Sequence, residues 1–234
     1  KSGSSGTFSN PNYKLMQAVS FDPTGSGRRD HVAFVGVSGQ NKKGYMWVID
    51  TTKGTDSDCS QQVEIGDFSY MFDKSDFEVP TYSNRSFFNI VAGDFDGDGK
   101  ESIVVYTPKQ TPRNQASGCQ IQQWDYDGNS LSQRGEGNSL LMGYYNDHPW
   151  YDVEDSEGNQ RRKLGVSMAV GDFNGDMVDD LAVLSYCHRL PNDEAKIDYY
   201  RPVVKIVYGT KGDTGSSIVT KSAAQSEEFY TSIG

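Results

Sequence analysis

The chain has few of the residues that usually carry catalysis, and it has no long apolar segment. Its 234 residues include three histidines and three cysteines, and its mean hydropathy is −0.65. No apolar run approaches the roughly 20 residues that a membrane-spanning helix needs, so no membrane span is expected. The net charge of −10 argues against the basic surface that binds nucleic acid, so no nucleic-acid partner is expected.

The cysteines and histidines do not form a recognisable catalytic group. Cys59, Cys119 and Cys187 are an odd number, so at most one internal disulfide forms; reduced, buried thiols are the alternative. The sequence contains no Gly-x-Ser-x-Gly elbow, no His-Glu-x-x-His helix and no phosphate-binding glycine loop. Cys187 and His188 are adjacent, but neighbouring residues of a strand point to opposite faces. The sequence therefore assigns no catalytic residue.

What the chain does have is an acidic turn that occurs twice, each time followed by an apolar run. The copies read VAGDFDGDGKESIVV at residues 91–105 and AVGDFNGDMVDDLAV at residues 169–183. Oxygen-bearing side chains occupy alternate positions, and Gly97 and Gly175 allow a sharp turn without a Cβ clash. Because calcium prefers six to eight oxygen ligands, the pattern predicts a calcium loop that joins two β-strands.

The predicted ligands are the first, third, fifth and seventh residues of each turn, the seventh through its backbone carbonyl. They are Asp94, Asp96, Asp98 and Lys100 in one copy, and Asp172, Asn174, Asp176 and Val178 in the other. Asp180 adds a carboxylate at the ninth position, where the other copy has Ser102. Without a cation, the ionised carboxylates would repel one another. Calcium is thus the expected cofactor, and a metal-free Asp/Gly-rich turn is the alternative.

An EF-hand is a less suitable interpretation of these turns. Its loop needs a bidentate Glu at position twelve and a helix on each side. Position twelve is Val105 in one copy and Val183 in the other, and both lie in β-rich runs. Strands rather than helices are therefore expected around the turns.

A weaker copy of the turn lies upstream and aligns without gaps from Asp22 to Asp30. The first and ninth acidic positions are kept, whereas Thr24 and Ser26 replace the middle carboxylates. Two nearby arginines also disfavour a cation. This copy is predicted to keep the turn and to bind calcium weakly through Asp22 and Asp30, or not at all.

Short strands are predicted around all three turns, because β-branched and aromatic runs there are bounded by turn residues. Apolar segments precede the turns at residues 15–21, 87–92 and 164–170, and later strands are expected at residues 45–49, 120–124 and 203–208. No helical stripe of useful length stands out. Four short strands per repeat are expected, the fourth being poorly defined.

The motif Gly-Asp-Phe-Asp/Asn-Gly-Asp, followed by Asp-Leu-Ala-Val, resembles the FG-GAP repeats of integrin α-subunit propellers and the related VCBS-type repeats. The resemblance covers most of the chain and implies an all-β fold, a β-propeller of four-stranded blades. It implies blade-like repeats at 11–85, 86–163 and 164–234, and the Ser/Gly-rich start of the chain predicts a flexible lead at residues 1–10. The repeats are longer than usual, and insertions are expected at residues 67–85, 144–162 and 187–200.

Three blades are fewer than the four to eight with which propellers generally close. The remaining blades are expected from a longer chain or from a partner chain. The resemblance implies an extracellular, calcium-stabilised module for adhesion, recognition or assembly, with no catalytic role. The alternatives are the propeller portion of a secreted polysaccharide lyase or other hydrolytic enzyme, and a carbohydrate-binding lectin.

Aromatic residues in a predicted insertion are the candidates for ligand binding. Tyr145, Trp150 and Tyr151 lie in the run YYNDHPWY. Exposed Tyr and Trp suit protein or carbohydrate ligands, and loops on a rigid scaffold often bind. Packing of these aromatic rings between blades is the alternative.

Overall fold

The computed structural model describes residues 13–41, 43–56, 62–67, 89–108, 119–135, 150–154, 160–164, 167–189, 199–220 and 226–230. All structural statements below refer to these residues. Among them, no helix has both the length and the apolar character required to cross a membrane.

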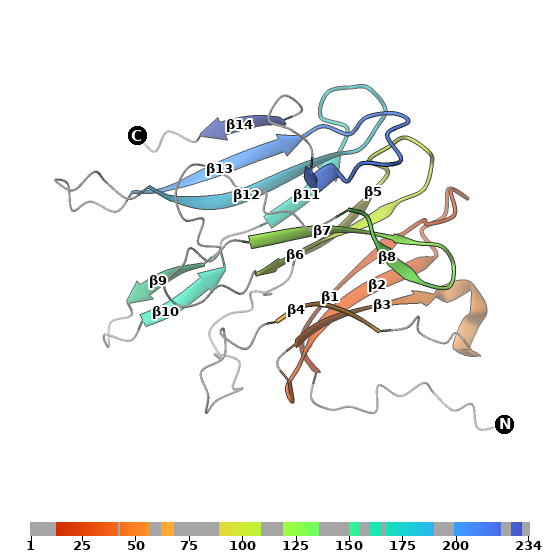
Figure 1. The fold of residues 1–234 in the computed structure, drawn as a ribbon, viewed down its shortest axis with the longest axis horizontal. Coiled ribbons are helices and arrows are strands. Elements are labelled where there is room, and N and C mark those ends of the chain that lie inside the picture. Colours follow the sequence, from red (N-terminus) through yellow and green to blue (C-terminus); the bar gives the residue numbers. More distant parts are fainter. Residues whose placement is uncertain are drawn as a thin grey trace.

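The protein is all-β and consists of antiparallel sheets, three of which have four strands in chain order (Figure 1). The first sheet contains β1 (Tyr13–Phe21), β2 (His31–Ser38), β3 (Lys43–Asp50) and β4 (Val63–Asp67). The middle sheet contains β5 (Asn89–Gly93), β6 (Ser102–Pro108), β7 (Cys119–Tyr126) and β8 (Leu131–Gln133). The third sheet contains β11 (Ser167–Gly171), β12 (Asp180–Arg189), β13 (Tyr199–Val207) and β14 (Ser226–Tyr230).

Smaller elements complete the described structure. A separate two-stranded sheet is formed by β9 (Trp150–Glu154) and β10 (Gln160–Leu164). It begins in the insertion predicted at residues 144–162, and β10 extends two residues beyond it. The short 3-10 helices η1 (Thr51–Asp56) and η3 (Ile218–Thr220) follow β3 and β13. Both ends of the insertion predicted at 187–200 belong to strands, because β12 extends to Arg189 and β13 begins at Tyr199. Residues 190–198 and residues 68–85 lie outside the described residues.

The middle sheet is packed on both faces. Ile103 and Val105 of β6 join a core with the first sheet, whereas the alternating Val104 and Tyr106 join a second core with the third sheet. This follows from the two-residue period of a strand, and it explains why the sequence of β6 is continuously apolar. The first strands of the sheets lie together, since β5 contacts both β1 and β11.

Two buried glutamines of β7 connect the middle sheet to its neighbours. The side-chain amide of Gln122 donates to the carbonyl of Ile65 in the first sheet at 3.0 Å. On the other face, Gln123 Oε1 accepts from the Ile218 N–H at 2.7 Å and from the Ser217 hydroxyl at 3.0 Å. Because an unpaired buried polar group costs about 1–3 kcal/mol, these bonds favour one mutual arrangement of the sheets.

Strand register defines three equivalent loops between the first and second strands of the sheets. The pairs that close them are Phe21↔His31, Gly93↔Ser102 and Gly171↔Asp180. We name residues 22–30, 94–101 and 172–179 the first, second and third loops. The first loop is one residue longer than the others, so the gapless alignment of the sequence was wrong beyond its sixth residue. By strand pairing, His31 is therefore equivalent to Ser102 and Asp180, the ninth residues of the other copies. Asp30 is equivalent to their eighth residues, Glu101 and Asp179.

Candidate metal centre

The three loops share one pattern of hydrogen bonds and backbone dihedrals over their first six residues, despite their different side chains. In each loop, the first aspartate accepts a hydrogen bond from the N–H of the residue five positions later. The distances are 2.6 Å from Gly27 to Asp22, 2.9 Å from Gly99 to Asp94, and 2.9 Å from Met177 to Asp172. The fourth and sixth residues have positive φ in every loop, namely Gly25, Gly27, Gly97, Gly99, Gly175 and Met177.

The second loop gathers three carboxylates at one point. Ligand oxygens of Asp94, Asp96 and Asp98 all lie within 4.8 Å of one another. Oxygens on opposite sides of a calcium ion are separated by about 4.6–5.2 Å, because each lies at about 2.3–2.6 Å from the metal. The separation and the donor chemistry of these three oxygens are compatible with calcium. The fourth predicted ligand, Lys100, follows directly, and its N–H donates to Asp98 Oδ1 at 2.7 Å.

The clustering is unfavourable for the ionised form of Asp94. Burial raises the pKa of its carboxyl, and the negative charge of Asp96 raises it further, against the opposing hydrogen bond from Gly99. A cation in the cluster would reverse this electrostatic preference.

One member of the cluster also has a fixed cationic partner. Arg134, which follows β8, donates from Nη1 to Asp96 Oδ2 at 2.6 Å and from Nε to Asp125 Oδ2 at 2.7 Å. Asp125 also accepts from the hydroxyl of Ser102 at 2.6 Å. Burial opposes the charge of Arg134, but the two carboxylates raise its pKa. Asp96 therefore offers a metal only its other oxygen, and Ser102 is tied to Asp125.

In the third loop, the predicted ligands Asp172, Asn174 and Asp176 are exposed, and each accepts a hydrogen bond from a backbone N–H. Asp172 Oδ1 accepts from the Gly175 N–H at 2.6 Å, and Asn174 Oδ1 accepts from the Asp176 N–H at 2.9 Å. The amide of Asn174 donates to Asp176 Oδ2 at 3.1 Å. The hydrogen bond from Met177, with those from Gly175 and Asp176, lowers the pKa of Asp172 despite the opposing desolvation.

Asp180, the ninth-position ligand predicted for the third loop, is fully buried. Its Oδ2 accepts from the Phe173 N–H and its Oδ1 from the Gly209 N–H, both at 2.8 Å. Burial raises its pKa, an effect that these two hydrogen bonds oppose. The carboxylate thus braces the loop against the segment after β13. The other predicted ligand, Val178, has a buried side chain and an N–H that donates to Asp176 Oδ1 at 2.9 Å.

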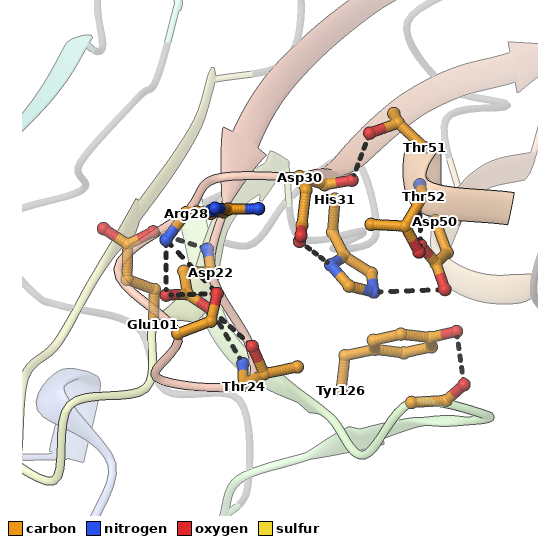
Figure 2. A network of polar contacts seen from close by, with 12 residues as sticks. Asp22, Thr24, Arg28, Asp30, His31, Asp50, Thr51, Thr52, Glu101 and Tyr126 are labelled. Carbon is orange, nitrogen blue, oxygen red and sulfur yellow. Dashed lines mark hydrogen bonds and ion pairs between the residues drawn. The ribbon is translucent and has the colours of Figure 1, made fainter. Parts of the chain in front are cut away.

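The first loop satisfies its single central carboxylate with neutral donors (Figure 2). Asp22 accepts from the Thr24 hydroxyl at 2.8 Å, from the Thr24 N–H at 3.0 Å and from the Arg28 N–H at 3.1 Å. Burial opposes ionisation, but the bonds from Thr24 and Gly27 together hold the pKa of Asp22 well below its usual value. In this loop, hydroxyl and backbone N–H donors therefore stabilise the ionised aspartate, as a cation would stabilise clustered carboxylates.

Asp30, the second weak ligand predicted in the first loop, is separate from Asp22 in its contacts. Its Oδ1 lies 2.8 Å from Nδ1 of the buried His31. The other ring nitrogen lies 3.8 Å from Asp50 Oδ2, and the ring lies against Tyr126 (Figure 2). The His31 ring also meets the ring of Phe21 edge-on, with 5.9 Å between centroids. His31 is thus buried and held by its neighbours, which is typical of a structural histidine.

Sequence reasoning missed an inter-sheet contact that occurs twice. The N–H of Asp22 donates to Glu101 Oε2 at 2.7 Å, and the N–H of Glu101 returns a bond to the Asp22 carbonyl at 2.8 Å. Likewise, the N–H of Asp94 donates to Asp179 Oδ2 at 2.8 Å, and the N–H of Asp179 donates to the Asp94 carbonyl at 3.0 Å. We call this reciprocal pair the latch. Its only sequence signal is an acid at the eighth position of the loop.

A cleft of about 440 Å³ lies beside the second loop. Its lining includes the basic residues Lys100 and Arg134 and four acids, Asp98, Glu101, Asp125 and Asp127. Tyr126 also lines it, but this ring is largely buried and its hydroxyl donates to the Gly128 carbonyl at 2.9 Å. The excess of carboxylates over cations would repel an acidic polysaccharide. This chemistry does not favour the lyase alternative.

The predicted ligand-binding aromatics are not brought into this site by any described contact. Tyr145 lies outside the described residues, whereas Trp150 and Tyr151 begin β9 and pair with Leu164 and Lys163 of β10. Comparison with known proteins adds no family to this description: no protein-family model matches the chain, and a search among curated proteins finds no match either.

Proposed function

We propose that the chain is a calcium-stabilised β-propeller module, used outside the cell for adhesion, recognition or assembly. The observation that carries the proposal is the carboxylate cluster of Asp94, Asp96 and Asp98, held within 4.8 Å between the first two strands of a sheet. Calcium would bind these oxygens and the Lys100 carbonyl in the second loop, and Asp172, Asn174, Asp176 and the Val178 carbonyl in the third. Asp180 would fix the third loop through the hydrogen bonds that it accepts from Phe173 and Gly209.

The propeller interpretation rests on three four-stranded sheets in chain order, with their first strands together and their faces packed. It also rests on the latch, which repeats the same contact between successive sheets. Further blades would have to continue this array. An extracellular location agrees with calcium loops of modest affinity, because calcium is abundant there. The ligand would be a protein or a carbohydrate.

Thermal unfolding in defined metal conditions tests the calcium proposal. Calcium at about 100 times its Kd should stabilise the fold by about 2.7 kcal/mol per site, or about 5–10 °C for a chain of this size. Magnesium is the control, because it demands a tighter octahedral geometry. Asp98→Ser, which gives the second loop the residue of the first at this position, should lose part of the calcium response. An identical Tm in chelator and in calcium would refute the proposal.

A further inference from the structure

The third sheet presents an end face on which the contacts made by the other sheets are missing. At the second position of the loops, Pro23 and Phe95 are buried, but Phe173 is 48% exposed. Asp22 and Asp94 are both held by a latch, whereas within the described part of the chain the N–H and carbonyl of Asp172 have no partner. The third loop therefore carries half of a contact that the protein completes twice elsewhere.

The strand face beside Phe173 is apolar and incompletely covered. Ala182 pairs with Ile206 and Leu184 with Val204, which places the four side chains on one face of β12 and β13. All four are partly exposed. Their equivalents in the middle sheet, Val104 and Tyr106 among them, are fully buried against the third sheet. A sheet of the same kind, packed in the same way, would cover this face.

The first sheet carries the other half of the latch. Asp30 stands at the position of Glu101 and Asp179, and in the described structure its N–H has no acceptor. Its Oδ1 contacts His31, whereas its Oδ2 has no hydrogen-bond partner among the described residues. On the corresponding strand face, Val32 and Ile49 form a cross-strand pair and are partly exposed. Beside them, Phe34 and Trp47 stack at 5.3 Å between ring centroids, and both rings are buried, so Val32 and Ile49 form the accessible part of this face.

The charges of the two ends are complementary. The first loop contains the exposed Arg28, whose backbone N–H is bonded but whose guanidinium has no partner among the described residues, and Arg29, which pairs with Glu101. The third loop presents the exposed acids Asp172 and Asp176. If loops met across a new contact as they do within the chain, Arg28 would lie beside this acidic loop.

We propose that the third-sheet end of one chain docks onto the first-sheet end of a second copy, so that Asp30 of one copy forms the latch with Asp172 of the other. This deepens the proposed propeller by naming the source of further blades. The contact is head-to-tail, so two such contacts would close a dimer with six four-stranded sheets if the rotation fits, and open chains of copies would form if it does not. Asp30 and Asp172 provide the register, and Phe173 provides the apolar anchor.

Sedimentation of the full 234-residue chain, as a function of protein concentration and salt, tests this inference. We expect reversible self-association that strengthens as salt rises to physiological levels, because each copy carries a net charge of −10 and screening reduces the overall repulsion. Phe173→Lys alters the third-sheet end and Arg28→Glu the first-sheet end; each variant should dissociate at least about tenfold more readily. The matched control, Asn129→Asp on the exposed β7–β8 turn of the middle sheet, should associate as the unsubstituted chain does.

Mixing the two end variants separates head-to-tail docking from other self-association. One variant retains an intact first-sheet end and the other an intact third-sheet end, so the mixture should recover association that neither shows alone. A symmetric dimer through two third-sheet faces would not recover in this way, and that result would overturn the inference. A chain that stays monomeric at all concentrations, while calcium still raises its Tm, would overturn the docking inference and leave the proposed function intact.

Discussion

The first and second loops share the hydrogen bond from the sixth residue to the first aspartate, but they have opposite electrostatics. In the first, Asp22 is surrounded by N–H groups and by the Thr24 hydroxyl, and its pKa is lowered. In the second, Asp94 shares its space with two more carboxylates, and its pKa is raised. The comparison teaches that the turn is specified by the first aspartate and two residues of positive φ. The charge placed inside that turn then decides whether it needs a cation.

The largest contrast is expected when the charge of the first aspartate is removed in chelator. Asp22→Asn should lower the free energy of unfolding by about 1.5–3 kcal/mol, the usual contribution of hydrogen bonds to a charged group. Asp94→Asn should leave it unchanged or raise it, because ionised Asp94 is disfavoured without a metal. Chemical denaturation of both variants measures this. Equal losses in the two variants would break the comparison between the loops.

The latch should matter about equally in both places where it occurs. Glu101→Gln and Asp179→Asn keep the size of the side chain but weaken a charge-assisted bond to a backbone N–H, which should cost about 1 kcal/mol each. Glu101→Gln also weakens the ion pair with the exposed Arg29, which adds at most about 1 kcal/mol. The exposed pair of Lys43 and Glu64, whose Nζ–Oε2 distance is 2.7 Å, is the control, and Glu64→Gln should cost less than about 0.5 kcal/mol. Urea denaturation would show whether the latch variants differ from this control.

The effect of pH on the two aspartate variants should have opposite signs. The folded pKa of Asp22 lies below 3.8, so its contribution to stability is present above pH 3.8 and is lost as the pH falls through the folded pKa. The folded pKa of Asp94 lies above 3.8, so the contribution of Asp94 to stability is present below pH 3.8 and is lost as the pH rises through the folded pKa. In chelator, raising the pH from 3 to 7 should make Asp22→Asn less stable relative to the unsubstituted chain and Asp94→Asn more stable. Parallel melting profiles would contradict the assigned directions.

The smallest effect concerns the sixth residue of the loops, which has positive φ in all three. Met177 has a φ of 67° and is 85% exposed, so Met177→Gly should relieve backbone strain of about 1–2 kcal/mol. The greater entropy of glycine in the unfolded chain offsets about 0.5–1 kcal/mol of this. Gly99→Ala should have the opposite sign, since an added Cβ there meets no atom within 4 Å and only strain remains. Equal melting temperatures for all three proteins would refute this reasoning.

The sequence predicted the features that depend on local pattern. Alternating and apolar runs located the first strands and the strands at residues 45–49 and 120–124, and the acid spacing located the second and third loops. The apolar twelfth position correctly indicated strands rather than helices, since Val105 lies in β6 and Val183 in β12.

The sequence could not predict contacts between residues that lie far apart in the chain. The latch joins residues separated by 79 and 85 positions, and Arg134 reaches Asp96 across 38 positions. The extra residue of the first loop was hidden because Asp30 gives an apparently correct acid at the ninth position. Only strand pairing assigns that position to His31.

The most direct test of the account is a crystal structure of the chain grown with calcium, with anomalous scattering used to locate the ions. The account predicts one ion among Asp94, Asp96 and Asp98, a second among Asp172, Asn174 and Asp176, and none at Asp22, whose hydroxyl and N–H donors already satisfy it. Saturating calcium that leaves the second and third loops without anomalous density, or that binds at Asp22 instead, would contradict it.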